Sequence, residues 1–218
     1  ARKVIQHFER SPNPPNMSLF TDRVHVKRVW EVRESSLGVI SHVPGEPLTW
    51  EGWEDSAVAP EKLGAYLRDL LRMMKSFDYR STLYGHFGDG CVHNRVNFDL
   101  QTAAGIAKFR RFMEEAADLV VSYGGSISGE HGDGQARAEL LDRMFGPELV
   151  QAFREFKRIW DPDWKMNPGK VVDPNRMDEN LRLGADYQPW HPETHFKFPQ
   201  DDGSLTLANL RCVGVSIC

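Results

Sequence analysis

Two histidines, His86 and His93, flank a glycine-rich segment with the composition of a tight β-turn. The runs on either side are rich in β-branched and aromatic residues, which is typical of a β-hairpin. If residues 88–91 form the turn, His86 lies directly opposite His93, on the same face of the sheet, with Cβ atoms ~4.5–5.5 Å apart. Two imidazoles in this arrangement can share one divalent metal ion.

A third ligand for such an ion is offered by Glu130, in the acidic, glycine-rich segment 128–134. Two histidines and one carboxylate leave a coordination position open, which is the pattern of catalytic metal sites and not of closed structural ones. The alternative ligands, or partners of the ligands, are Asn94, Asn97 and Asp89. Surface histidines that only form hydrogen bonds would show the same spacing, so the metal site is a hypothesis.

His131 directly follows Glu130. Adjacent residues of an extended segment point to opposite sides, so we expect His131 to face a substrate or cofactor if Glu130 faces a metal. An ordinary loop histidine is the alternative. Arg33 has the fork of donors that binds a carboxylate with two hydrogen bonds. It could equally pair with Glu31 or Glu34 on a solvated helix face.

The three cysteines of the chain, Cys91, Cys212 and Cys218, are odd in number and unevenly placed. They lack the spacing of a disulfide framework in a secreted protein, which favours a reducing, cytoplasmic compartment. We expect Cys91 to be a small turn residue instead of a metal ligand.

Composition limits the classes of protein that fit. Of the 218 residues, 40% are apolar and 27% are charged, which excludes a mainly disordered chain. The net charge of −4 is not that of a basic nucleic-acid-binding protein. Apolar runs in the sequence are shorter than the ~18 residues that a membrane-spanning helix needs. We therefore expect a globular chain without a transmembrane segment.

The elements that must position these side chains are a hairpin and amphipathic helices. Apolar residues recur every three or four positions in five segments, which predicts helices over residues 22–37, 61–76, 102–123, 135–145 and 147–160. Residues 1–10 are similar to the end of a further helix, and a short strand should begin at residue 126. Residues 38–59 are expected to form a long irregular loop of the kind that often carries function. A hairpin packed with helices indicates an α+β fold, with helices on one face of an antiparallel sheet.

Four motifs then occur in the order of one known family: WEVRE (30–34), YGHFGDGCVHNRVNF (84–98), SGEHGDG (128–134) and DPDWKMNPGK (161–170). Together they resemble the C-terminal cap region of FAD-linked oxidases of the vanillyl-alcohol oxidase type. The members that the chain resembles most are bacterial D-lactate, glycolate and D-2-hydroxyglutarate dehydrogenases. Two further segments, GWEDSAV (52–58) and RCVGVSIC (211–218), are similar to long members with a fused iron–sulfur domain.

The resemblance implies a ferredoxin-like α+β cap over a flavin ring, formed by residues 1–174 and incomplete at its N-terminus. An FAD-binding domain would precede residue 1, which is Ala and not Met. Residues 175–218 would be an arm and the start of a truncated iron–sulfur domain. Cys212 and Cys218 would be the first cysteines of a [4Fe–4S] motif, which needs four ligands. The missing FAD-binding and iron–sulfur domains would be partners, and a homo-oligomer is also expected.

The resemblance also implies a function for each site residue. The ligands of a divalent metal, expected to be zinc, would be His86, His93 and Glu130. Arg33 would bind the substrate carboxylate, and His131 would be the catalytic histidine near the flavin. Asn167 and Lys170 would lie at the flavin edge. The implied reaction is FAD-dependent oxidation of a D-2-hydroxy acid to a 2-oxo acid, with electrons passed to the iron–sulfur domain.

The chain departs from the family pattern at Cys91 and Arg95, which puts the details of the substrate pocket in doubt. Two other classes of function stay open: a metal-dependent hydrolase and a non-catalytic docking module. A cytoplasmic location is expected, with peripheral association at the inner membrane face as a second option.

Overall fold

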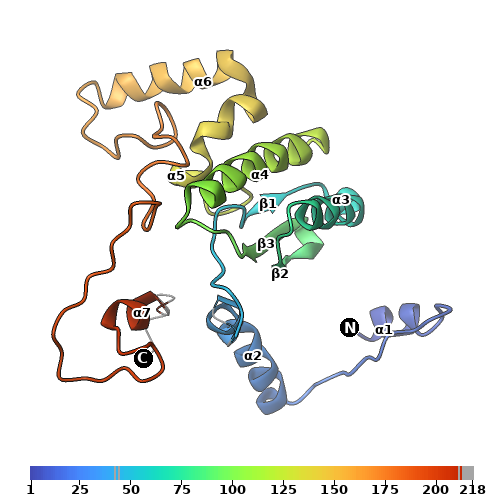
Figure 1. Ribbon diagram of the computed structural model, residues 1–218. Coiled ribbons are helices and arrows are strands. Elements are labelled where there is room, and N and C mark those ends of the chain that lie inside the picture. Colours follow the sequence, from blue (N-terminus) through green and yellow to red (C-terminus); the bar gives the residue numbers. More distant parts are fainter. Residues whose placement is uncertain (42, 44, 211, 213–218) are drawn as a thin grey trace. The chain divides into compact units, whose positions relative to one another are not determined.

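The computed structural model of the protein describes residues 1–41, 43, 45–210 and 212. The chain divides into two compact units, residues 1–39 and the residues from 40 onward. The first unit contains helix α1 (Arg2–Phe8) and most of helix α2 (Arg23–Ser41) (Figure 1). Asp22 caps α2, because its Oδ1 accepts the backbone N–H of His25 at 2.9 Å. The helix predicted over residues 22–37 is present and continues to Ser41.

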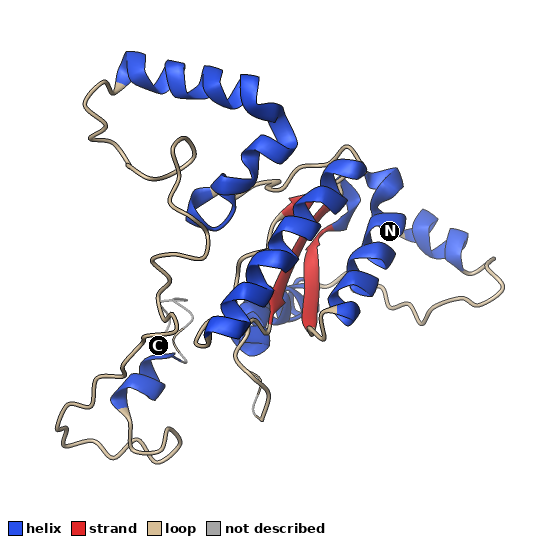
Figure 2. Ribbon diagram, turned by 45° about the horizontal axis from the view of Figure 1, so that its top comes forward, coloured by secondary structure: helices blue, strands red, loops and turns tan. Residues whose placement is uncertain are grey.

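A three-stranded antiparallel sheet in the order β1-β3-β2 organises the second unit (Figure 2). Strands β2 (Ser81–His86) and β3 (Cys91–Val96) form the predicted hairpin around the 3₁₀ turn η2 (Phe87–Asp89). The short strand β1 (Ser56–Ala57) pairs with the other edge of β3. It lies within the segment that was expected to be irregular throughout, and so that part of the loop prediction is wrong.

The register of the hairpin differs from the expected one by two residues. The turn comprises residues 87–90, so Cys91 opens β3 instead of lying in the turn. His86 pairs with Cys91, and His93 pairs with Tyr84. Because strand side chains alternate with a period of two, this shift leaves His86 and His93 on the same face, as diagonal neighbours. Their ring centroids are 5.6 Å apart, so the predicted proximity of the two histidines is confirmed.

Two amphipathic helices cover one face of this sheet (Figure 2). They are α3 (Leu63–Ser76), entered through the 3₁₀ turn η1 (Pro60–Lys62), and α4 (Ala103–Ser122). The Thr102 hydroxyl caps α4 by accepting the backbone N–H of Gly105 at 3.0 Å. Fully buried core side chains come from both helices and from the strands, and include Tyr66, Leu70, Phe112, Met113, Val92 and Val96. The α+β class is thereby confirmed, whereas the ferredoxin-like topology stays a prediction.

The strand expected from residue 126 is reduced to a single bridge between Ser126 and Ala57. The chain then forms α5 (Gly134–Arg137), the 3₁₀ turn η3 (Ala138–Leu140) and α6 (Leu141–Trp160). Two helices were expected here, and α6 is indeed broken by non-helical backbone at Gly146, directly before Pro147.

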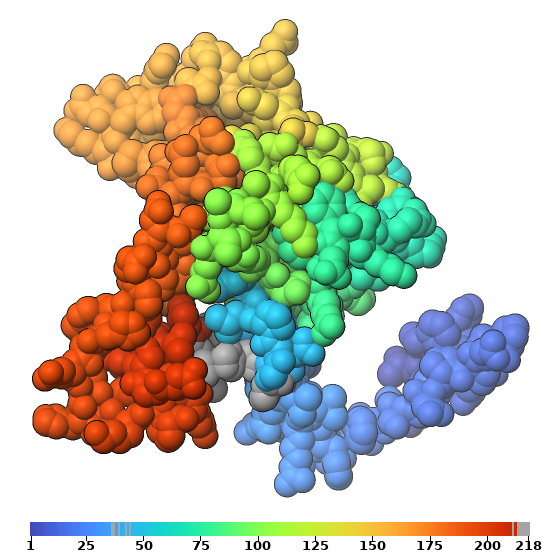
Figure 3. Space-filling model, in the orientation of Figure 1, coloured from blue at the N-terminus to red at the C-terminus, as the bar shows by residue number. Residues whose placement is uncertain are grey.

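The outer side of α6 is uncovered in the space-filling view (Figure 3). Phe156, Ile159 and Trp160 of α6 expose 64 to 74% of their surface. Beyond α6 the chain is mostly irregular until α7 (Leu205–Leu210). Among the described residues, none of the helices combines the length and the apolar character needed to cross a bilayer.

Candidate metal and catalytic site

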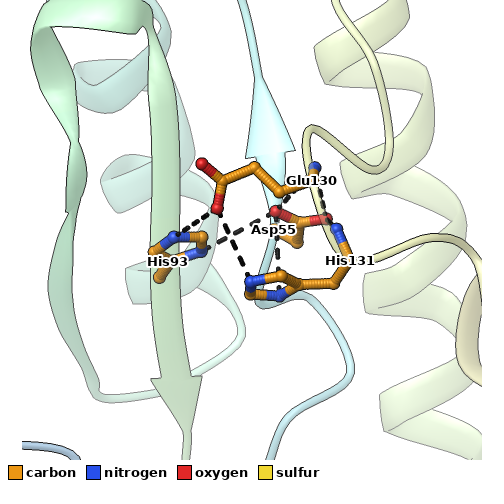
Figure 4. A group of neighbouring side chains, drawn as sticks. All are labelled: Asp55, His93, Glu130 and His131. Atoms are coloured by element: carbon orange, nitrogen blue, oxygen red, sulfur yellow. Dashed lines mark hydrogen bonds and ion pairs between the residues drawn. The ribbon is translucent and has the colours of Figure 1, made fainter.

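Four side chains converge on the face of the sheet opposite α3 and α4 (Figure 4). They are Asp55 from the segment before β1, His93 from β3, and Glu130 and His131 from the bend between α4 and α5. One ligand-type atom of each lies within 4.8 Å of the others. Asp55 and His93 are buried, whereas Glu130 and His131 are exposed, so the group is open to solvent on one side.

The Glu130 carboxylate contacts the other two predicted metal ligands, His86 and His93. Its Oε1 lies 3.4 Å from His86 Nε2, and its Oε2 lies 3.3 Å from His93 Nε2. Ligand atoms at the corners of a tetrahedral zinc site, with bonds of ~2.0–2.2 Å, are separated by roughly 3.3–3.6 Å. These two contacts use different oxygens of Glu130, and among the described residues the group whose ligand-type atoms lie within 4.8 Å of one another contains His93 and Glu130 but not His86. An ion shared by His86, His93 and Glu130 therefore stays a prediction.

The orientation of His93 also fits a metal ligand. Its Nδ1 lies 3.0 Å from the backbone carbonyl oxygen of Glu54, which can only accept a hydrogen bond. In the neutral ring Nδ1 therefore carries the proton, and the lone pair of Nε2 faces Glu130. Histidines that bind metals are commonly oriented by such a bond from the second ring nitrogen.

Asp55 shapes the bend that carries Glu130 and His131. Its carboxylate is fully buried and accepts hydrogen bonds from the Ser128 hydroxyl at 2.6 Å and from the backbone N–H groups of Glu130 and His131 at 3.0 and 2.8 Å. Burial alone raises the pKa of Asp55, but these hydrogen bonds outweigh it and hold the pKa below its usual range. Asp55 therefore stays ionised and fixes the backbone of the bend.

This bend contradicts the prediction that Glu130 and His131 face opposite sides. Two successive N–H groups point at one carboxylate, so the segment curves instead of extending. His131 Nε2 lies 3.6 Å from Glu130 Oε2, within the same group. The His131 ring also stacks on the His93 ring, with centroids 4.8 Å apart and planes 8° apart.

Three site residues were missed in the sequence: Glu54, Asp55 and Arg137. Glu54 lies 2.9 Å from His131 Nδ1, and the buried Arg137 lies 3.2 Å from Glu54. Two consecutive carboxylates in the apolar motif GWEDSAV were an available signal. Their hydrogen bonds to Glu130 and His131 join segments more than 70 residues apart, and this pairing has no local signal in the sequence.

The alternative ligands lie outside this group. Burial, together with the charges of Glu130 and Asp55, raises the pKa of Cys91 to about 12, and its Sγ lies 3.7 Å from Asp55 Oδ1. Asn94 is on the opposite face of β3 from His93, because strand side chains alternate. Asn97 Oδ1 accepts the backbone N–H of Arg80 at 2.7 Å.

The remaining predicted residues are placed elsewhere in the chain. Arg33 is an exposed residue of α2. Lys170 Nζ donates to the side chain of Gln135, in the first turn of α5, and Asn167 is exposed with left-handed backbone at φ 47°. Cys212 is exposed, and Cys218 lies outside the described residues. The functions expected of these residues stay predictions.

Comparison with known proteins decides the family. The sequence pattern of "FAD linked oxidases, C-terminal domain" matches residues 10–171. The chain belongs to this family. It is 33% identical over 179 residues to D-2-hydroxyglutarate dehydrogenase of Pseudomonas putida, which covers 81% of this chain and 18% of that protein. The resemblance drawn from the four motifs is thereby confirmed.

Two other relatives are also named as oxidases or dehydrogenases of 2-hydroxy acids. Glycolate oxidase subunit GlcD of Escherichia coli is 26% identical over 186 residues, 85% of this chain and 35% of that subunit. D-lactate dehydrogenase of Archaeoglobus fulgidus is 36% identical over 118 residues, 54% of this chain and 26% of that enzyme. The chain thus spans less than a fifth of the Pseudomonas dehydrogenase and about a third of GlcD.

Proposed function

We propose that this chain is the cap of an FAD-dependent dehydrogenase that oxidises a D-2-hydroxy acid to a 2-oxo acid. The observation that carries the proposal is the Glu130 carboxylate between His86 and His93, with His131 stacked beside it, in a chain of the FAD-linked oxidase family. The names of the relatives, which are D-2-hydroxyglutarate, glycolate and D-lactate enzymes, support the class of substrate.

In this proposal His86, His93 and Glu130 hold a divalent cation, with zinc the expected ion. A divalent cation supplies positive charge that orients a hydroxy acid and favours loss of its hydroxyl proton. Asp55 holds the bend in this proposal, because its Oδ2 accepts hydrogen bonds from the Ser128 hydroxyl and from two backbone N–H groups. The exposed side of the group leaves room for the substrate.

His131 takes the hydroxyl proton in this proposal, since the ordinary pKa of a histidine side chain, ~6.5, suits a general base near neutral pH. Arg33 binds the substrate carboxylate, and Asn167 and Lys170 lie at the flavin edge. A bound FAD supplies the acceptor for the hydride that leaves Cα. The longer polypeptide would provide the domain that binds most of the FAD.

Cys212 and Cys218 would lie at the start of an iron–sulfur domain that receives the electrons. Their spacing and the likeness of residues 211–218 to long family members support this part of the proposal. A [4Fe–4S] cluster needs four ligands, so further cysteines must come from outside these two.

The proposal is tested by rapid mixing of the full-length enzyme with D-2-hydroxy acids. The flavin should be reduced by a D-2-hydroxy acid, and His131→Gln should slow this reduction by about 100-fold or more, the effect of losing a general base. The matched control is His191→Gln, an exposed histidine of the irregular arm, which should leave the rate unchanged. An unchanged rate in His131→Gln, or hydrolytic activity without flavin, would contradict the proposal.

A further inference from the structure

We propose that Glu54 is a positioning residue for His131, which holds the proton of that imidazole on Nδ1 and turns Nε2 toward the substrate. The catalytic consequence rests on the function proposed above, whereas the tautomer follows from the geometry of this chain alone. Glu54 is not one of the predicted metal ligands. In this proposal its side chain acts on the reaction through His131.

Both oxygens of the Glu54 carboxylate face His131. Nδ1 lies 2.9 Å from Oε2 and 3.1 Å from Oε1. An ionised carboxylate can only accept hydrogen bonds, so the proton of the neutral ring lies on Nδ1. Nε2 is 3.6 Å from Glu130 Oε2, which is too long for a hydrogen bond. The lone pair of Nε2 is therefore not used by a hydrogen bond to Glu130, and it faces the group that Glu130 and His93 form.

Arg137 holds Glu54 in this position. Its guanidinium is almost fully buried and lies 3.2 Å from Glu54 Oε1. The same group donates to the carbonyl oxygens of Gly52 at 3.1 Å and Gly132 at 2.6 Å. It therefore ties the segment of Glu54 to the bend of His131, and its charge compensates the burial of the Glu54 carboxylate.

Glu54 orients the two stacked histidines by different means. The backbone carbonyl of Glu54 accepts the Nδ1 proton of His93, and its side chain accepts that of His131. A side-chain substitution removes only the second bond. His93 is therefore an internal control for any change seen at His131.

The direct test is nitrogen-15 NMR of the metal-free, histidine-labelled chain, about two pH units above the usual histidine pKa of ~6.5. His131 should show the Nδ1–H tautomer in the unaltered chain. In Glu54→Met, His131 should shift toward the Nε2–H tautomer while His93 stays unchanged. The matched control is Glu51→Gln, which removes an exposed carboxylate of the same segment and should alter neither ring.

Either of two NMR results would overturn the proposal. One is an Nε2–H tautomer of His131 in the unaltered chain, and this result does not depend on whether any variant folds. The other is an Nδ1–H tautomer that persists in a folded Glu54→Met chain.

Flavin reduction in the full-length enzyme separates positioning from a purely structural role. Glu54→Met should slow reduction by about 10- to 100-fold, as loss of histidine-orienting partners does in metal sites. Glu54→Gln should lose less of the rate than Glu54→Met, because an amide oxygen at the place of Oε1 can accept from both His131 and Arg137, whereas the amide nitrogen at the place of Oε2 cannot accept. Equal loss in both variants would mean that only the charge opposite Arg137 matters, and would overturn the proposal.

A failure of the proposed function would give other results than a failure of the proposal for Glu54. In that case His131→Gln would reduce its flavin at the normal rate, while the tautomer of His131 would still depend on Glu54. The two ideas can therefore be judged separately.

Discussion

At the scale of single residues, the site depends on carboxylates with different tasks. Glu130 lies between two imidazoles, as a metal ligand would. Asp55 is fully buried and accepts three hydrogen bonds from the bend. Glu54 contacts His131 through its side chain. All three side chains are carboxylates, and the groups that each one contacts determine its role in the site.

We predict that Asp55→Asn destabilises the protein, because the amide nitrogen would face N–H donors where an oxygen now accepts them. The expected loss of unfolding free energy is about 1–3 kcal/mol, the cost of leaving buried donors without an acceptor. Urea denaturation would measure it. Asp89→Asn, an exposed acid of the hairpin turn, should change stability by less than about 0.5 kcal/mol. Equal stability of both variants would contradict the role given to Asp55.

The sequence predicted some of these residues and not others for a physical reason. His86 and His93 are separated by one turn, so local spacing was enough to bring them together. Glu130 was proposed from the acidic, glycine-rich segment that contains it, and the resemblance to a family implies the same residue. Glu54 and Asp55 form two adjacent carboxylates in the sequence, but their hydrogen bonds to Glu130 and His131 connect segments more than 70 residues apart, and so their roles could not be predicted.

At the scale of elements, the hairpin turn sets the position of His86. Gly90 closes the turn with left-handed backbone at φ 77°, and a Cβ atom there would lie only 1.8 Å from the Val58 carbonyl oxygen. The predicted turn began one residue too late, which shifts the strand pairing by two residues, because glycine, aspartate and cysteine fit several turn positions equally well. The predicted face was nevertheless correct, since a shift of two preserves the alternation of side chains.

Gly90→Ala should therefore lower the unfolding free energy by more than about 2 kcal/mol, from unfavourable backbone and overlap with Val58. Gly88→Ala is the matched control, because a Cβ atom there meets nothing within 4 Å. Thermal or urea unfolding of both variants would decide. A Gly90→Ala protein as stable as Gly88→Ala would show that the turn has a different conformation.

An ion-pair network links α4, η3 and the arm, and it predicts a pH dependence. Arg110 lies 2.5 Å from Glu139 and 2.8 Å from Asp178. Burial alone raises the pKa of Glu139, but the hydrogen bonds from Arg110 outweigh this effect and lower the pKa. The pKa of Asp178 is also lowered, chiefly by its hydrogen bonds with Arg176.

A carboxyl with a lowered pKa stabilises the folded state above its unfolded pKa, here ~4, and this contribution is lost as pH falls through the folded value. Arg110→Met should therefore be less stable than the unaltered protein at pH 7, with a difference that shrinks below pH ~4. Urea unfolding over this pH range would measure it. Arg72→Met, which removes an exposed ion pair of α3, should show a smaller effect. A difference that does not depend on pH would contradict this account.

At the scale of the whole molecule, the chain divides into two compact units. The proposed metal ligands belong to the unit that begins at residue 40, whereas Arg33 belongs to the first. Metal binding and substrate binding should therefore be separable. The chain spans less than a fifth of the Pseudomonas relative, so substrate turnover must be measured in the full-length enzyme.

We expect Arg33→Ala in that enzyme to lower kcat/KM by about 10- to 100-fold, through loss of hydrogen bonds to a charged substrate group. Metal content should stay the same. Arg28→Ala, another exposed arginine of α2, is the matched control and should leave kcat/KM unchanged. Equal kcat/KM values for the two variants would remove Arg33 from substrate binding.

The central claim is that His86, His93 and Glu130 form a metal site, and elemental analysis of the purified chain tests it most directly. The account predicts about one divalent ion per chain, and its loss in Glu130→Gln and in the double variant His86→Ala/His93→Ala. The matched control is His191→Ala/His195→Ala, which removes two exposed histidines of the arm and should keep the ion. Equal metal content in all of these folded proteins would contradict the claim.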